Sequence, residues 1–300
     1  MTRVLVTGGA GTVGRFVVDD LLERGYEVTV SGRSEPDKES FRAPVRFIEL
    51  PLDPKSPFED ALAGCDMLVH AAFSHVAGRY RGGEGDDVAG FWRSNFLATL
   101  LLFQAAAQSG VERAVFLSSR AAYGSQTPGA PLVETTPCHP DTHYGAVKRA
   151  CERHLKELDR DSGLAVTSLR VTGVYGSPPG GAEHKWLSLF ADYRAGRPIA
   201  PRCGTEVHGR DVAGAIRLML EADRSKVAGE IFNVSDLLVD RHDLLELVAE
   251  RTRCSIPPPA PADHASYNVM DTAKLRGLGW QPGGKELLES EVARLVARTD

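Results

Sequence analysis

The sequence predicts an α/β fold, a doubly wound parallel sheet followed by a smaller carboxyl-terminal α/β part. Three observations carry this prediction. Apolar, strand-like runs alternate with amphipathic, helix-like segments over residues 1–170. A glycine turn directly follows the first of these strands. Small or polar residues stand where later strands should end, which is typical of a sheet that holds a ligand at the carboxyl ends of its strands.

The first strand, Arg3–Val6, runs through the glycine turn into a helix over Arg15–Glu23. The turn carries a Gly-x-Gly-x-x-Gly pattern over residues 9–14. This is the dinucleotide-binding fingerprint of the Rossmann fold, whose glycines make the tight turn, admit a pyrophosphate and let helix and strand pack closely. The phosphates would bind at the helix N-terminus, where free N–H groups favour an anion. We therefore expect a nicotinamide cofactor to contact Gly8, Gly11, Thr12, Val13 and Gly14.

The end of the second strand, Glu27–Ser31, bears on the choice of cofactor. An acid about 20 residues after the glycines holds the ribose 2′-OH of NAD, whereas an arginine accommodates the 2′-phosphate of NADP. Gly32 and Arg33 occupy that place, so we predict NADP, with NAD as the alternative. The competing interpretation is a loop arginine that contacts only solvent.

The third and fourth strands are Val45–Leu50 and Met67–Ala72. Ala71 and Ala72 end the fourth strand, so we expect them beside the cofactor. Asp53 either meets the adenine amino group or caps the helix beginning near Ser56. The polar, glycine-rich stretch over residues 73–90 is too long for an ordinary connection and is either an active-site loop or an irregular surface segment.

The candidate catalytic residues belong to the second half of the predicted sheet and its helices. A helix over Phe91–Gln108 contains Asn95, and the fifth strand, Ala114–Ser118, leads to Ser119. Tyr144 and Lys148 then share one face of a helix that runs from His143 to about Asp159. An ammonium near a phenol favours the phenolate and lowers its pKa from about 10 toward neutrality, which makes a tyrosine a general acid/base. An exposed helix pair with no function is the alternative for this spacing alone.

These features together resemble the extended short-chain dehydrogenase/reductase family, and within it the NAD(P)-dependent sugar epimerases and dehydratases. The resemblance spans nearly the whole chain. It rests on the following segments: Thr7 to Gly14, Asn95, Ser118 to Gly124, Tyr144 to Lys148, Leu169 to Gly176, Val207 to Ala213, Asp271, and Leu278 to Pro282.

The resemblance implies a catalytic role for three residues. Tyr144 would be the acid/base, Lys148 would lower its pKa and hold the nicotinamide ribose, and Ser119 would bond the reacting oxygen. Asn95 would be structural or part of a proton relay. The cofactor-binding set that we predict is completed by Arg33, Ala71, Ala72, Asn95, Tyr144, Lys148 and Val171.

Two departures from the family pattern narrow the reaction and the substrate. The 4,6-dehydratases place Asp-Glu after the catalytic Ser or Thr, where this chain has Arg120-Ala121, so we do not expect elimination of water. Many nucleotide-sugar enzymes also carry an arginine seven residues before the aspartate of the Val-x-Asp motif. Here that position is Gly204, which weakens the assignment of a nucleotide sugar.

Composition restricts the other expectations. A net charge of −5 without a basic run argues against nucleic acid or a membrane as partner and favours a small molecule. Met1 leads directly into the first strand and no apolar stretch is long enough to span a bilayer, so we expect a cytoplasmic protein. The cysteines and histidines lack metal-site spacing, so no metal is expected. The resemblance implies a homodimer through helices near residues 95–108 and 144–158.

We therefore predict a dinucleotide-binding domain over residues 1–170, with returning segments near 207–235, and a mainly substrate-binding domain over 171–300. The predicted activity is transfer of hydride between nicotinamide and a carbinol or carbonyl carbon of a sugar or sugar-nucleotide-like substrate. An epimerase that retains its cofactor is the first alternative. A catalytically silent NADP-binding sensor is the second, and the presence of Ser119, Tyr144 and Lys148 argues against it.

Overall fold

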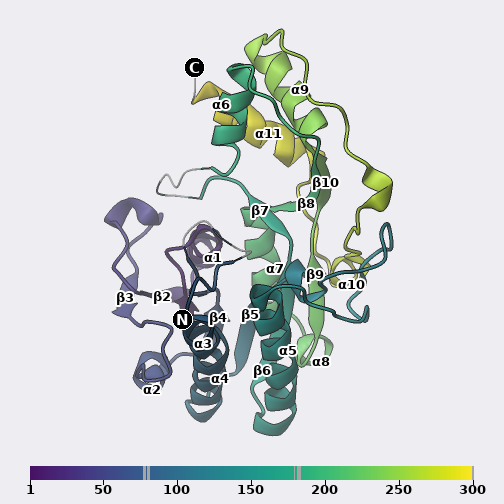
Figure 1. Ribbon diagram of the computed structural model, residues 1–300. Coiled ribbons are helices and arrows are strands. Elements are labelled where there is room, and N and C mark those ends of the chain that lie inside the picture. Colours follow the sequence, from purple (N-terminus) through teal and green to yellow (C-terminus); the bar gives the residue numbers. More distant parts are fainter. Residues whose placement is uncertain (77–78, 80–81, 179, 181–183, 299–300) are drawn as a thin grey trace.

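The computed structural model describes residues 1–76, 79, 82–178, 180 and 184–298. A seven-stranded sheet with the order β3-β2-β1-β4-β5-β6-β9 forms its centre (Figure 1). All neighbouring strands in it pair in parallel. The strands are β1 (Arg3–Thr7), β2 (Glu27–Gly32), β3 (Arg46–Glu49), β4 (Met67–His70), β5 (Arg113–Ser119), β6 (Ala165–Val171) and β9 (Ile231–Val234).

The order of the strands creates the binding crevice. The chain begins at β1, crosses to β2 and β3 on one side, and then returns to β4 on the other side of β1. Ligands of such sheets bind outside the carboxyl ends of the two strands at which the direction reverses. Here those strands are β1, which the glycine turn follows, and β4, which Ala71 and Ala72 follow. The doubly wound fold is confirmed.

Helices cover both faces of the sheet because its strands are apolar on both sides. On one face α1 (Thr12–Glu23) packs along α7 (Gly209–Glu221), and their apolar side chains belong to one buried cluster. On the other face α2 (Phe58–Leu62), α4 (Ala98–Gln108) and α5 (His143–Ser162) belong to a second cluster. Helix α1 begins three residues before the predicted Arg15, because Gly11 takes the N-cap position with extended backbone.

The helix that carries Asn95 is less regular than predicted. It begins at α3 (Val88–Trp92), passes through a π-helical segment, η2 (Arg93–Leu97), and continues as α4. A π segment inserts one extra residue into a helix and is frequent at functional sites. Here it places Asn95 on the buried side of the helix, 2% exposed.

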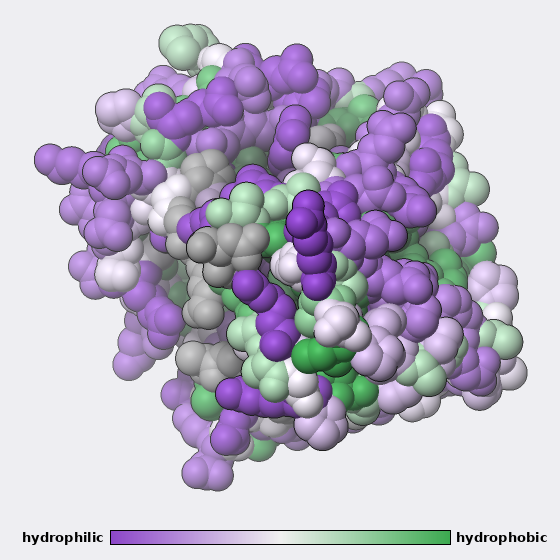
Figure 2. Space-filling model, turned by 90° about the horizontal axis from the view of Figure 1, so that it is seen from above, coloured by the Kyte–Doolittle hydropathy of each residue, from purple (hydrophilic) through white to green (hydrophobic). Residues whose placement is uncertain are grey.

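A second, three-stranded sheet was not predicted as a unit. It has the order β10-β8-β7, from β7 (Gly173–Tyr175), β8 (Cys203–His208) and β10 (Leu237–Asp240). With α6 (Leu187–Arg194), α9 (Arg241–Thr252) and α11 (Gly284–Ala297) it forms the upper, carboxyl-terminal lobe of Figure 1. Trp186, Phe190 and Tyr193 lie in the buried cluster of this lobe. Seen from above, the surface is mostly hydrophilic with small hydrophobic patches (Figure 2).

Short elements complete the described chain: η1 (Lys38–Ser40), η3 (Arg120–Ala122), α8 (Arg224–Val227), η4 (His264–Ser266) and α10 (Ala273–Arg276). Within the described residues, no helix combines the length and apolarity that crossing a membrane requires.

Candidate active site

The glycine turn is built so closely that two of its glycines are sterically required. Gly8 has a φ of +69°, and a Cβ on it would lie 2.6 Å from the Ala72 nitrogen. A Cβ on Gly14 would lie 2.2 Å from the Gly8 oxygen. The turn therefore packs directly against Ala71 and Ala72, the residues after β4. Gly11 differs, because its Cβ would meet only the Gly8 oxygen, at 3.2 Å, and the residue is exposed.

This contrast predicts different effects for two matched alanine substitutions. Gly11→Ala should fold normally but lose NAD(H) and NADP(H) affinity by at least about 10-fold, because its methyl group fills space that a pyrophosphate needs. Gly14→Ala should lower both cofactor affinity and the melting temperature, because the methyl group collides with backbone. Fluorescence titration of the cofactors and thermal unfolding measure the two effects. Unchanged cofactor affinity in Gly11→Ala would contradict the assignment of the turn.

A buried histidine ties the carboxyl ends of β1 and β4 to α4. His70 Nδ1 lies 2.6 Å from the Thr7 hydroxyl, and Nε2 lies 2.9 Å from the Thr99 hydroxyl. Burial, and secondarily the charge of Lys148, lowers the pKa of His70 to about 3. The imidazole is therefore neutral at physiological pH and adds no second positive charge beside Lys148. The position of His70 at the end of the fourth strand follows from the sequence, but its role as a buried, neutral bridge does not.

Helix α5 meets the end of β5 with almost no space between them. Ser119 is the N-cap of η3, where its hydroxyl accepts a hydrogen bond from the Ala121 N–H at 3.2 Å. A Cβ on Gly145 would lie 2.2 Å from the Ala121 oxygen. The residue after Tyr144 is thus a glycine because the first turn of α5 touches η3. This contact brings the segment that carries Ser119 to the segment that carries Tyr144.

Lys148 is buried beneath this contact. Its Nζ donates a hydrogen bond to the Leu117 carbonyl at 2.6 Å and lies over the rings of Phe73 and Phe116, at 4.6 and 4.7 Å from their centroids. Burial lowers the pKa of the ammonium to about 8. The ammonium also lies 5.9 Å from the centre of the Tyr144 ring. The pair is therefore not an exposed helix pair.

Phe73 is a second residue that the sequence analysis missed. Its ring packs edge-on against the Tyr144 ring, with centroids 4.9 Å apart at 85°. The same ring lies against the Lys148 ammonium, so one side chain orients both members of the pair. Phe73 begins the polar stretch over residues 73–90, of which residues 77–78 and 80–81 lie outside the described residues.

Asn95 uses its whole amide group to hold the start of this stretch. Its Oδ1 accepts from the Ser74 N–H at 2.7 Å, and its Nδ2 donates to the carbonyls of Ser74 and Phe91 at 2.7 and 3.0 Å. These bonds favour the structural alternative for Asn95, because they leave no polar atom of the amide without a partner.

A buried ion pair anchors α5 to the sheet. Glu152, one turn after Lys148, binds Arg170 of β6 through two hydrogen bonds of 2.7 and 2.9 Å. The Ser118 hydroxyl donates a third hydrogen bond to Glu152 at 2.6 Å.

The Tyr123 side chain extends this network to β9. Arg170 lies over the Tyr123 ring, and the Tyr123 hydroxyl donates to Asn233 of β9. The segment Ser118 to Gly124 thus holds α5, β6 and β9 together through Ser118 and Tyr123, in addition to carrying the candidate catalytic Ser119.

The remaining predicted residues differ in their burial. Thr12 and Arg33 are exposed, Val13 is partly buried, and Val171, which ends β6, is buried. Asp53 is exposed and accepts a hydrogen bond from the Lys55 N–H at 2.8 Å. The alternative in which Asp53 caps the next helix is wrong, because α2 begins at Phe58 with Pro57 at its N-cap. Asp53 instead closes its own turn.

The family model of the NAD-dependent epimerase/dehydratase family matches residues 4–235, which include both the glycine turn and the Tyr144–Lys148 helix. The chain belongs to this family. It is accordingly an NAD(P)-dependent enzyme of the extended short-chain dehydrogenase/reductase type.

Individual members of the family resemble this chain over almost its full length. A UDP-glucose 4-epimerase of Corynebacterium glutamicum is 29% identical, with 95% of this chain and 92% of that protein covered. The structure of a Thermus thermophilus UDP-glucose 4-epimerase in complex with NAD is 30% identical with a TM-score of 0.78, covering 99% of this chain and 98% of that one. A Thermotoga maritima UDP-glucose 4-epimerase solved with UDP-glucose is 26% identical with a TM-score of 0.81, covering 99% and 98%.

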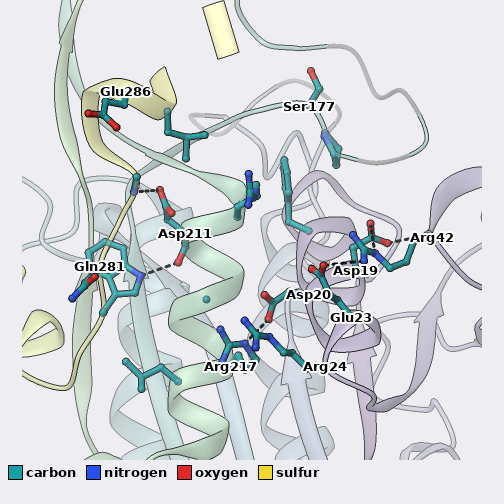
Figure 3. Close-up of a pocket in the computed structure, with 18 of the residues that line it drawn as sticks. Asp19, Asp20, Glu23, Arg24, Arg42, Ser177, Asp211, Arg217, Gln281 and Glu286 are labelled. Atoms are coloured by element: carbon teal, nitrogen blue, oxygen red, sulfur yellow. Dashed lines mark hydrogen bonds and ion pairs between the residues drawn. The ribbon is translucent and has the colours of Figure 1, made fainter. Parts of the chain in front are cut away.

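Two late segments that carry the family resemblance, Val207 to Ala213 and Leu278 to Pro282, lie together in the structure. Asp211, from the Val-x-Asp segment, accepts from the Gly283 N–H at 3.1 Å, and its carbonyl accepts from the Trp280 indole at 2.9 Å (Figure 3). Burial raises the pKa of the Asp211 carboxyl to about 6. The late motifs therefore fasten the carboxyl-terminal segment to α7 and add no group to the catalytic cluster.

A large cleft of about 1180 Å³ lies between α1, α7 and α11. Figure 3 draws residues that line it. Its walls carry paired charges, such as Asp20 with Arg217 and Asp19 with Arg42. Neither the glycine turn nor Ser119, Tyr144 or Lys148 lines it. The candidate catalytic residues Ser119, Tyr144 and Lys148 therefore lie at the strand ends and not in this larger cleft.

A smaller cleft of about 360 Å³ lies in the carboxyl-terminal lobe. Gly204 lines it, at the position where many nucleotide-sugar enzymes carry an arginine. Three cationic side chains, Lys185, Arg202 and Arg241, line it as well, and Lys185 is paired with Glu206. Because Asp192 and Glu206 also line the cleft, the cationic side chains there exceed the anionic ones by one.

Proposed function

We propose that this chain reversibly oxidises a secondary alcohol of a sugar or sugar-nucleotide-like substrate, with Ser119, Tyr144 and Lys148 as the reacting side chains. The observation that carries the proposal is the position of Lys148, buried between Phe73 and Phe116 with its ammonium on the Leu117 carbonyl, one helical turn from Tyr144. A buried ammonium is retained where its charge acts on a neighbouring group.

The open side of Gly11 and the free N–H groups at the start of α1 fit a dinucleotide pyrophosphate. A nicotinamide dinucleotide held there by the glycine turn would supply hydride transfer from a carbinol carbon or to a carbonyl carbon. Tyr144 takes the hydroxyl proton as the alcohol becomes a ketone and gives it back in the reverse direction. Ser119 donates a hydrogen bond to the substrate oxygen, and Lys148 stabilises the Tyr144 phenolate.

Epimerisation is the outcome of this chemistry that the relatives favour. The three relatives described above are UDP-glucose 4-epimerases, and an epimerase needs no catalytic group beyond the same three side chains. Arg120-Ala121 in place of the dehydratase Asp-Glu argues against elimination. Incubation with UDP-sugars, free sugars and small ketones, followed by NAD(P)H absorbance and analysis of product isomers, separates net redox turnover from epimerisation. Absence of both would contradict the proposal.

We propose NADP as the preferred cofactor. Arg33 is exposed after β2, and no described residue hydrogen-bonds or ion-pairs with its side chain, so it is available to a 2′-phosphate. Charge-assisted hydrogen bonds contribute about 1.5–3 kcal/mol, or roughly 10- to 150-fold in affinity. Arg33→Ala should therefore lose most of the preference for NADP over NAD.

Gly32→Asp should reverse the preference toward NAD. A Cβ at Gly32 would meet its nearest neighbours only at 3.8 and 3.9 Å, so the aspartate fits without distorting β2, and its charge would repel a 2′-phosphate. Titration of both cofactors against the wild type and the two variants is the measurement. Tighter binding of NAD than of NADP by the wild type would mean that the loop with Gly32 and Arg33 contacts only the ribose and not a 2′-phosphate.

We also propose that residues 1–170, with returning segments near 207–235, form the dinucleotide-binding domain, and that residues 171–300 mainly bind substrate. The return of β9 to the seven-stranded sheet supports the interleaved division. A cytoplasmic location stays a prediction.

We propose a homodimer that forms through the helices near 95–108 and 144–158. Leu97 of η2 is 43% exposed, and the partly exposed Phe96 of η2 and Leu100 and Leu101 of α4 are apolar neighbours of it along the helix. Two such groups of side chains bury each other in a helix bundle. Sedimentation should give about twice the mass of 32.4 kDa at micromolar concentration, and Leu97→Glu should yield monomer. A wild-type monomer would contradict this proposal.

A further inference from the structure

The residue directly after Ser119 is a positively charged side chain held in a fixed position. Arg120 Nη2 donates to the Asn268 carbonyl at 3.0 Å, and the guanidinium lies 4.9 Å from the centre of the Tyr267 ring. Both partners belong to the segment that follows η4, nearly 150 positions along the chain. These two contacts fix the plane of the guanidinium at the junction of the main sheet and the carboxyl-terminal lobe.

The charge of Arg120 has no counter-ion in the part of the chain that the structure describes. No described carboxylate forms an ion pair with it, and its Nε is buried without a hydrogen-bond partner. A guanidinium stays charged at all physiological pH values, and a buried donor without an acceptor is destabilising. Such a group calls for an explanation, and a ligand that supplies the acceptor is one.

Tyr267 contacts Arg120 with its ring and approaches Gly204 with its hydroxyl. Among the described residues, this hydroxyl is the neighbour within 4 Å of a Cβ on Gly204, at 3.9 Å, and Gly204 lines the smaller cleft. Tyr267 is fixed there because its hydroxyl accepts from the Thr205 N–H at 3.3 Å. Arg120 directly follows Ser119, the last residue of β5, so a group that binds its guanidinium would lie at the residue next to Ser119.

We propose that Arg120 determines specificity by binding an anionic group of the substrate, a carboxylate in the first instance, close to the carbon that is oxidised. This inference rests on the proposed function, because it takes Ser119 as the residue that binds the reacting oxygen. The planar guanidinium matches the two oxygens of a carboxylate. The structure thus points to a sugar acid, or a nucleotide-linked sugar acid, in preference to the neutral sugar.

Calorimetry on pairs of ligands that differ in one group tests this inference. The titrations use the Tyr144→Phe variant saturated with cofactor, because this substitution prevents turnover of the ligand. The first pair of ligands is UDP-glucose and UDP-glucuronic acid, and the second pair is glucose and glucuronic acid. Glucose 6-phosphate distinguishes a phosphate from a carboxylate. We expect the acid of at least one pair to bind about 10- to 150-fold more tightly than its neutral partner. Arg120→Gln in the same background should abolish that difference, and Arg120→Lys should retain part of it.

Arg46→Gln is the matched control, because Arg46 is exposed at the amino end of β3, the opposite end from the crevice. It should leave the ratio unchanged. Equal affinities within each pair, tighter binding of the neutral sugar, no binding by any probe, or an unchanged ratio in Arg120→Gln would each overturn the inference. Tighter binding of glucose 6-phosphate than of both acids would replace the carboxylate by a phosphate. A cofactor titration comes first, because failure to bind NAD or NADP contradicts the proposed function and not the role of Arg120 alone.

Discussion

Tyr144→Phe should lower kcat by at least about 10³-fold while the affinity for NAD(P) changes less than about 3-fold. The substitution removes the hydroxyl that exchanges a proton with substrate, and general acid/base groups contribute about 10²–10⁴-fold to rate. The ring itself stays, so its edge-on contact with Phe73 and the packing of α5 are kept. Steady-state kinetics and a cofactor titration measure the two quantities.

Tyr26→Phe is the matched control. Tyr26 lies just before β2, and its hydroxyl donates to Glu221 of α7 at 3.0 Å, away from the strand ends. The control should keep wild-type kcat. If Tyr144→Phe also kept it, the proton transfer would have to come from another group, and the mechanism proposed for Tyr144 would be wrong.

Lys148→Met should abolish catalysis yet stabilise the cofactor-free protein. Catalysis is lost because the phenolate of Tyr144 and the nicotinamide ribose lose the same ammonium. The free energy of unfolding rises because a buried positive charge is replaced by an apolar side chain of similar length. The pKa near 8, lowered by burial from an ordinary 10.5, corresponds to a cost of at most about 3 kcal/mol, offset in part by the lost bond to the Leu117 carbonyl. We expect a net gain of roughly 1–3 kcal/mol at pH 7.

The pH dependence of this gain has a defined sign. The unfolded chain holds the Lys148 proton up to about pH 10.5, whereas the folded chain releases it near pH 8. Between these values the unfolded state binds more protons, so wild-type stability rises with pH. The advantage of Lys148→Met should therefore be full below pH 8 and should vanish toward pH 10.5. Denaturant unfolding at pH 7 and pH 10 measures it. A destabilised variant at pH 7 would show that the lysine is structural.

Local sequence was sufficient for the sheet and for the pairs of residues that one element carries. The glycine turn can be recognised from consecutive residues. Its backbone packs against other backbone so closely that no Cβ fits at Gly8 and Gly14, and these positions must therefore be glycine. Tyr144 and Lys148 share a helix face, so their spacing alone predicts their contact. The strands of the main sheet are apolar runs, which only a parallel, doubly covered sheet buries.

Tertiary structure decided the features that join distant parts of the chain. Phe73 reaches Tyr144, and Arg120 reaches Tyr267, because the crossover connections bring these segments to one end of the sheet. The three-stranded sheet escaped prediction because β7 has three residues and shows no period of its own. The charge states of His70 and Lys148 also depend on burial that no spacing reveals. The sequence by itself determined which elements form and which groups can react, because periodicity and steric limits act locally. Only the fold decided their neighbours and their electrostatics, because those arise from contacts between segments that are far apart in the chain.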